Sequence, residues 1–462
     1  MLRFVSLLCV AVVLSFTSLA AVRAVDNPPV KKDAKPPRYK LHVGLELNYA
    51  GESEVKFDGG SRHSRSTWKL LVVRQNTDGG VRVFVRYGIQ REKRQNDAAE
   101  PQFGDEHVVL AWCDVKPDGR VADNPTLDFM LNVRPLLPQL PPAGEATWQA
   151  ENALTKVRED YALGATADED HLAIVDTTHG PTDEIYSTSE KNTILFDTKR
   201  GFVDQVEGEL KQDYRNAAIQ TTHVMLKEVN RVDPNLATAV ALEMSDYFAV
   251  KREYDELIER AGIEPAQTAK LLAQAKSNLE DLRAALLTEV LQKQIDADLA
   301  QHDLMATMSE EQAQDVAAVL DKPSPDWKTT DLEGDARSIE GCRGKVVVLD
   351  FWYRGCGWCI RAMPQIKEVV AHYQGQPVEV LGMNIDKEEA DARFVIDKLA
   401  LNYPTLKAEG LPGKYGVRGF PTLIVIDQAG LVRAFHVGYT PTLYKNLTAT
   451  IDKLLAETPA AK

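Results

Sequence analysis

Val346 to Cys359 reads VVVLDFWYRGCGWC, an apolar run followed at once by a C-x-x-C pair. The unbroken apolar run predicts a strand that is buried on both faces, and the pair is expected to open the next helix. Cysteines three positions apart in a first helical turn lie on the same side of the helix, so their sulfurs can form a disulfide and separate again. The pair is therefore predicted to exchange electrons as dithiol and disulfide.

Cys356 should be the more reactive of the two cysteines. A thiolate attacks disulfides, and the unpaired N–H groups and partial positive charge at a helix N-terminus stabilise a thiolate there. Cys359, one turn further on, is placed to resolve the mixed disulfide that Cys356 forms. The alternatives are half of a zinc knuckle or a purely structural disulfide. A zinc site needs four ligands, and the chain has no second C-x-x-C and no H-x-x-x-H, so we expect neither a metal nor another cofactor.

Positions flanking the pair carry a family resemblance. Asp350 ends the apolar run, Trp352 follows it, Pro364 falls inside the expected helix, and residues 419–422 read GFPT. In this arrangement residues 323–462 resemble the thioredoxin superfamily, and within it the extracytoplasmic TlpA and ResA branch. Thioredoxins have a buried acid under the disulfide, an aromatic residue, a helix-kinking proline and a cis-proline loop at the four places. The resemblance implies an α/β thioredoxin-like fold and thiol-disulfide oxidoreductase activity.

The resemblance also implies roles for individual side chains. Asp350 would accept the proton of Cys359 during resolution, unless it is simply the solvated end of the strand. Pro421 in the cis form would expose the backbone of Phe420 to an extended substrate chain, whereas a trans proline would belong to an ordinary loop. Trp358, Phe420 and Pro421 are the expected substrate contacts.

Departures from the family pattern limit how finely the activity can be predicted. Gly355 replaces the usual aromatic residue and Gly357-Trp358 replaces a dipeptide with proline, so the redox potential and the direction of electron flow cannot be read from the sequence. Ala362 replaces a glutamate of the ResA type that is linked to cytochrome maturation, which argues against a dedicated haem-pathway reductase. Tyr353 replaces the threonine of peroxiredoxins, which argues against peroxide reduction of that type.

Further elements of a thioredoxin-like sheet are predicted within residues 323–462. We expect an opening hairpin, a second buried strand, an inserted helix, a late hairpin and a closing helix capped by Thr440-Pro441. In chain order these occupy residues 325–334, 378–385, 388–401, 423–436 and the stretch up to Leu455.

The N-terminus is expected to direct the chain out of the cytoplasm. Residues 1–24 read as a signal peptide, with one early charge and an apolar stretch that ends in small residues. The alternative is an uncleaved membrane anchor from Phe4 to Val22. Cys9 would leave with the signal, and residues 25–37 are predicted to be a flexible lead-in. The protein is therefore expected to be periplasmic or otherwise extracytoplasmic.

The remaining chain is long enough for further domains, since it has 462 residues in all. Residues 38–232 alternate apolar and polar side chains and predict an antiparallel β domain of unknown function, in which barrel and sandwich are both open. Its histidines show no ligand spacing. Residues 235–320 have helical periodicity, with one apolar stripe from Leu271 to Val290 that could pair with a second subunit as a homodimer. Residues 321–325 are the expected hinge.

The favoured function is an exported thiol-disulfide oxidoreductase, with reductase preferred as its direction. Its partners would be a disulfide-containing protein substrate and a membrane or envelope thiol electron donor. The formal charge of −14 argues against nucleic acid. In the alternative, the β domain binds an envelope component and the redox domain only maintains thiols of that complex. Cys113 and Cys342 are expected to be buried or partly buried single thiols. The alternatives are a bridge between the two halves of the protein or an approach of Cys342 to the active pair.

Overall fold

The computed structural model describes residues 35–93, 102–122, 133–151, 158–165, 168–179, 187–213 and 218–457. The described residues form two compact units, with the division between Asn230 and Arg231. The predicted signal peptide or anchor, Cys9 and most of the lead-in lie outside the described residues. No helix in the described ranges combines the length and apolar character needed to cross a membrane.

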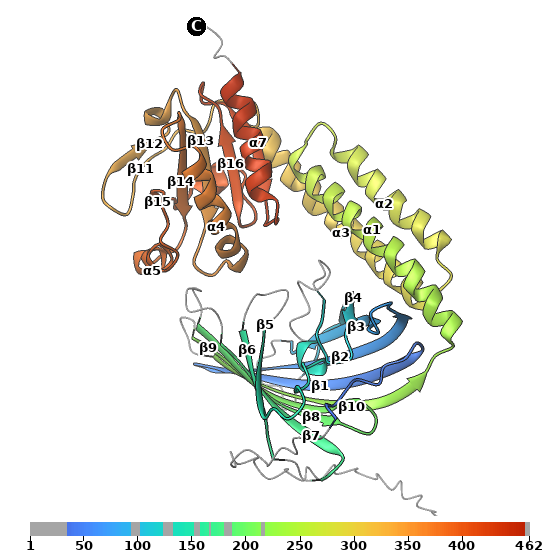
Figure 1. Ribbon diagram of the computed structural model, residues 1–462. Coiled ribbons are helices and arrows are strands. Elements are labelled where there is room, and N and C mark those ends of the chain that lie inside the picture. The colour runs from blue at the N-terminus through green and yellow to red at the C-terminus, as the bar shows by residue number, and fades with distance from the viewer. Residues whose placement is uncertain are drawn as a thin grey trace, which may run out of the picture. The chain divides into compact units, whose positions relative to one another are not determined.

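The first unit is one ten-stranded antiparallel sheet (Figure 1). Its order is β4-β3-β2-β1-β10-β9-β8-β7-β6-β5, with β4 and β5 as edges. Among the described residues the sheet therefore neither closes into a barrel nor splits into a sandwich. The strands are β1 Leu45–Phe57, β2 Gly60–Gln75, β3 Val81–Arg91, β4 His107–Val115, β5 Thr147–Glu151, β6 Arg158–Leu163, β7 His171–His179, β8 Ser187–Asp197, β9 Phe202–Asp213 and β10 Ala218–Arg231.

Alternating side chains place the core of this unit on one sheet face. Leu45, Leu47 and Tyr49 of β1 share a buried cluster with Val81, Val83 and Val85 of β3. The alternation that begins at Tyr39 predicts a longer first strand than the structure has. Tyr39 precedes the strand, because its backbone N–H donates to the carbonyl of Pro117 (2.9 Å) instead of extending the ladder.

Three helices open the second unit, α1 Pro234–Ile263, α2 Thr268–Ala285 and α3 Glu289–Val319. The apolar stripe predicted as one helix face is divided between α2 and α3. The break occurs because the Glu243 carboxylate of α1 accepts hydrogen bonds from the backbone N–H groups of Leu287 (2.7 Å) and Thr288 (3.0 Å), which caps α3. Most of the stripe is buried within these helices and is not free to pair with a second subunit.

The thioredoxin-like part follows as a five-stranded sheet in the order β15-β14-β13-β16-β17. Helices α4 and α7 pack on one face of β13, and the end of α3 packs on the other. The bounds are β13 Val346–Trp352, α4 Gly357–His372, β14 Val378–Asn384, α5 Glu389–Leu399, β15 Thr405–Lys407, α6 Leu411–Lys414, β16 Thr422–Ile426, β17 Val432–Val437 and α7 Leu443–Ala456, after a hairpin of β11 Lys328–Thr330 and β12 Ala336–Ser338.

The predicted elements of this part are present, with one correction. Thr442, not Thr440, occupies the N-cap position of α7, and its side chain makes no cap hydrogen bond. The Thr440 hydroxyl instead accepts a hydrogen bond from the backbone N–H of Thr442 (3.3 Å), so it belongs to the turn before the helix.

The two remaining cysteines are free and buried. Burial raises the pKa of the Cys113 thiol to about 12 and that of the Cys342 thiol to about 11. The prediction of buried single thiols is confirmed, and both thiols should react slowly at neutral pH.

A redox fragment that begins at Pro323 should be less stable than one that begins at Pro234. Val316 and Val319 of α3 are 0% and 8% exposed and belong to the core beneath β13. Their loss should lower the free energy of unfolding by roughly 3 kcal/mol. Urea titration followed by tryptophan fluorescence measures this, because residues 234–322 contain no tryptophan. Equal midpoints for the two fragments would show that α3 does not support the redox domain.

Candidate active site

The C-x-x-C pair forms a disulfide at the N-terminus of α4. Cys356 is the N-cap residue, and its sulfur accepts a hydrogen bond from the backbone N–H of Cys359 (3.1 Å). Cys356 is 6% exposed and Cys359 is 1% exposed, so an attacking thiol reaches Cys356 more easily. After reduction, the same N–H group would stabilise a Cys356 thiolate.

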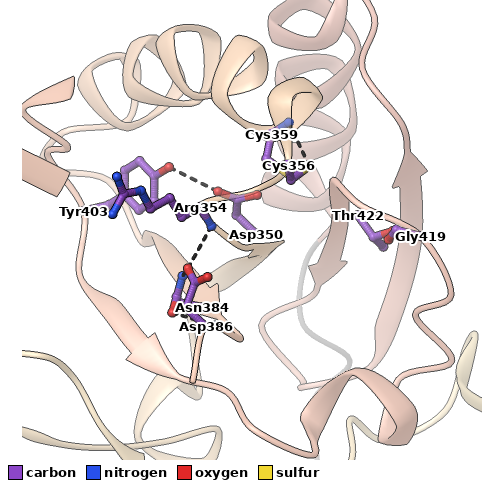
Figure 2. The surroundings of a disulfide bond; sticks show 9 residues. All are labelled: Asp350, Arg354, Cys356, Cys359, Asn384, Asp386, Tyr403, Gly419 and Thr422. Atoms are coloured by element: carbon purple, nitrogen blue, oxygen red, sulfur yellow. Dashed lines mark hydrogen bonds between the residues drawn. A yellow bond between two sulfur atoms is a disulfide. The ribbon is translucent and has the colours of Figure 1, made fainter. Parts of the chain in front are cut away.

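Asp350 lies buried on the sheet face that α4 covers. It alternates with Val347 and Leu349, which face the opposite core, and is only 1% exposed. Figure 2 shows the Tyr403 hydroxyl directed at the carboxyl group, to which it donates a hydrogen bond (3.1 Å). Burial raises the pKa of Asp350 to about 7, and the bond from Tyr403 opposes part of that rise. The alternative of a solvated strand end is therefore wrong.

The neighbours of Asp350 across the sheet are Gly382 on β14 and Leu423 on β16, and His436 follows on β17. A Cβ on Gly382 would lie 2.8 Å from Thr405 Oγ1, so a larger residue does not fit there. Burial lowers the pKa of His436 to about 4. His436 therefore stays neutral in the range where Asp350 titrates.

The loop before β16 contains the expected cis proline. The Phe420–Pro421 peptide bond is cis, which rules out the trans alternative. The Thr422 hydroxyl donates to the carbonyl of Gly419 (2.8 Å), and Figure 2 shows both residues. Phe420 meets the ring of Tyr353 edge to face, with ring centroids 5.4 Å apart. The loop thus contacts the segment that leads into the disulfide.

The three predicted substrate contacts differ in exposure. Trp358 is 41% exposed, whereas Phe420 is half-buried and Pro421 is buried. Trp358 stacks on Tyr439 at 5.7 Å between ring centroids, and Arg361 lies over the Trp358 ring at 5.1 Å. An aromatic surface with a cation beside it therefore flanks Cys356.

Arg354 links the start of the active-site turn to the inserted helix α5, a contact that the sequence did not reveal. Its guanidinium pairs with buried Asp391 (2.9 Å) and lies over Phe394 (4.1 Å). Its backbone N–H donates to Asp386 (2.8 Å), as Figure 2 shows. The one feature of the sequence that could have pointed to Arg354 is its position two residues before Cys356. No feature of the sequence pointed to Tyr403 as the partner of Asp350, because the two lie 53 residues apart.

One group of side chains within the described ranges has ligand types suited to a metal, namely His171, Asp197 and Asp204 in the first unit. Arg200 already pairs with both carboxylates, through a contact of 2.5 Å to Asp197 and a second contact to Asp204. His171 Nε2 lies 3.0 Å from Asp204. We interpret the group as an ion-pair network. The position of His171 in the sequence shows no ligand spacing, and the side chain of His179 lies outside the described residues.

Comparison with known proteins places the resemblance in the same part of the chain. The AhpC/TSA family model matches residues 320–435. The thiol-disulfide oxidoreductase ResA of Halalkalibacterium halodurans is 33% identical over 110 residues, and that of Geobacillus thermodenitrificans is 32% identical over 124 residues. These matches cover 23% and 26% of this chain, and the chain spans 62% and 71% of the two relatives. In the solved structures, a thiol:disulfide interchange protein DsbE from Chlorobium tepidum is 29% identical in sequence. The match covers 29% of this chain and 96% of the DsbE chain, with a TM-score of 0.28.

Proposed function

We propose, on the premise that the chain belongs through its C-terminal domain to the thioredoxin-like thiol-disulfide oxidoreductases of the ResA type, that it reduces protein disulfides outside the cytoplasm. The observation that carries the proposal is the disulfide on the first turn of α4, with the more accessible sulfur at the N-cap. Support for export comes from residues 1–24 of the sequence alone.

The reaction begins from the reduced pair. The Cys356 thiolate attacks one sulfur of the substrate disulfide, a mixed disulfide forms, and the other substrate sulfur leaves as a thiolate. The Asp350 carboxylate then accepts the proton of Cys359, whose thiolate attacks the Cys356 sulfur. The Cys356–Cys359 disulfide forms and the second substrate thiol is released. Two electrons have passed to the substrate, and a dithiol donor must return them.

Substrate binding is assigned to Trp358, Phe420 and Pro421. The exposed Trp358 ring offers apolar contact beside Cys356. The Phe420–Pro421 bond is cis, and Phe420 meets Tyr353 in the segment that leads into the disulfide. A peptide chain that carries the substrate disulfide would lie along this surface.

The reduced protein should catalyse the reduction of insulin, with dithiothreitol as donor, and the turbidity of the released B chain measures the rate. A redox titration with defined thiol buffers gives the direction. We expect a reduction potential near that of thioredoxin, about −270 mV, whereas a value near −120 mV would identify an oxidase. A Cys356→Ala variant is the control. An intact chain that accelerates insulin reduction no better than this variant would refute the proposal.

A specific feature of the first unit favours the alternative function. A groove of about 720 Å³ crosses its sheet and is lined by polar and charged side chains that include His63, Arg65 and His223. If the β domain is the working part, the full chain should retain an envelope component after Cys356 and Cys359 are both changed to alanine. Under our proposal, these changes abolish the activity of the protein altogether.

A further inference from the structure

The last turns of α3 contact the segment directly before the cis proline. Arg418 Nη1 lies 2.5 Å from a carboxylate oxygen of Glu311, and Arg418 Nε pairs with Asp315. Glu311 and Asp315 are four residues apart and therefore lie on one side of α3. One guanidinium in the loop thus bridges two successive turns of the helix.

The backbone of the same segment also lies against α3. Gln312 donates a hydrogen bond from Nε2 to the carbonyl of Gly416 (3.0 Å). Gly416 has φ +69°, and a Cβ there would lie 2.7 Å from Asp315 Cβ, so only glycine allows this approach. A Cβ on Gly262 of α1 would lie 3.3 Å from Gln312 Cγ, which shows that α1 packs against the same glutamine.

Apolar packing continues the contact towards the active site. Val316 of α3 and Tyr415 are both fully buried in one cluster, and Val417 and Phe420 pack against its edge. On its other side, Phe420 meets Tyr353. The loop that leads to Pro421 is therefore held between α3 and the active-site segment.

We propose that α3 is a clamp that fixes the substrate loop, residues 416–421, and that Arg418 is its positioning residue. The inference rests on the proposed function for what the loop binds. Exposed ion pairs are weak one at a time, but here two pairs on Arg418 act together with a side-chain hydrogen bond and a close backbone approach at Gly416, two residues away. Because the clamp touches neither cysteine, it should govern substrate affinity and leave the thiol chemistry unchanged.

The test compares Arg418→Ala with the wild type in the full chain. The KM for insulin should rise roughly fivefold while kcat stays the same. The reduction rate of the small disulfide 5,5′-dithiobis(2-nitrobenzoate) should not change, because this compound does not need the loop. Arg418→Lys should restore part of the affinity. Lys345→Ala is the matched control, because Lys345 is exposed about as much as Arg418 and also forms an ion pair, with Glu379 (2.7 Å).

Hydrogen exchange provides a readout that does not depend on activity. Arg418→Ala, and Glu311→Ala combined with Asp315→Ala, should each speed amide exchange in residues 416–422 severalfold without affecting α4. The triple variant should exchange no faster than the double variant, because all three changes break the same contact. If wild-type protein fails to reduce insulin, the proposed function fails and the exchange result still decides the clamp. The clamp proposal would be overturned if residues 416–422 exchanged in Arg418→Ala as they do in Lys345→Ala. It would also be overturned if Arg418→Ala lost activity equally towards both disulfides.

Discussion

Changing Cys359 to serine should arrest the reaction at the mixed disulfide and leave the substrate bound to Cys356. The hydroxyl of serine cannot displace the substrate sulfur, so turnover should fall roughly 1000-fold or more. The adduct should accumulate because Cys356 is the more exposed sulfur and is the N-cap of α4. Mass spectrometry of a non-reducing digest, after incubation with a peptide disulfide, measures the adduct and its position.

Two controls separate this result from general thiol reactivity. Cys356→Ser should yield no adduct at the pair, because Cys359 is 1% exposed. Cys342→Ser should behave as wild type, because burial raises the pKa of that thiol to about 11 and leaves almost no thiolate at neutral pH. Failure to trap any adduct at Cys356 in the Cys359→Ser variant would contradict the assigned order of attack.

The sequence predicts the active-site turn well because its determinants are local. An apolar run that ends in C-x-x-C determines both β13 and the start of α4, and the position of Cys356 at the N-cap follows from the same few residues. The partner of Asp350 could not be predicted in this way. Tyr403 reaches the carboxyl from beyond α5, and only the pairing of β14 with β13 and β15 brings the two side chains together.

In the other parts of the chain, local patterns predict elements but not their arrangement. Alternation identifies the strands of the first unit, yet β1 lies next to β10 in the sheet, a neighbour from the far end of the unit that no local pattern specifies. The apolar stripe from Leu271 to Val290 is regular enough for a single helix. It is interrupted because Glu243, which belongs to another helix, binds the backbone at Leu287 and Thr288.

Changing Asp350 to asparagine should slow resolution of the mixed disulfide roughly 100-fold at pH 8, because the proton acceptor for Cys359 is lost. In the wild type, the carboxyl titrates with a pKa of about 7, so the resolution rate should fall as the pH decreases through that value. The variant should show no such midpoint. Stopped-flow tryptophan fluorescence in single turnovers measures both rates. His436 cannot produce the midpoint, because burial lowers its pKa to about 4.

Tyr403→Phe tests whether the midpoint belongs to Asp350. The Tyr403 hydroxyl favours the ionised carboxylate, so its removal should move the midpoint to higher pH. Tyr373→Phe is the matched control, because Tyr373 donates an equivalent bond to Asp452 (2.7 Å). A midpoint near 7 that persists in Asp350→Asn would exclude Asp350 as the proton acceptor.

Asp350→Asn should also change the free energy of unfolding. The wild-type protein should lose stability as the pH rises, whereas its resolution rate increases. The pKa of Asp350 is about 7 in the folded protein against an ordinary value of 3.8, so the folded state retains a proton that the unfolded state loses between these values. The wild type is therefore destabilised as the pH rises from about 4 to 7, by roughly 4 kcal/mol at most. Asp350→Asn should exceed the wild type in unfolding free energy at pH 8 and match it below pH 4. Because urea titrations of the oxidised protein measure this without any substrate, a gain in stability together with unchanged resolution would show that Asp350 is buried but does not transfer the proton.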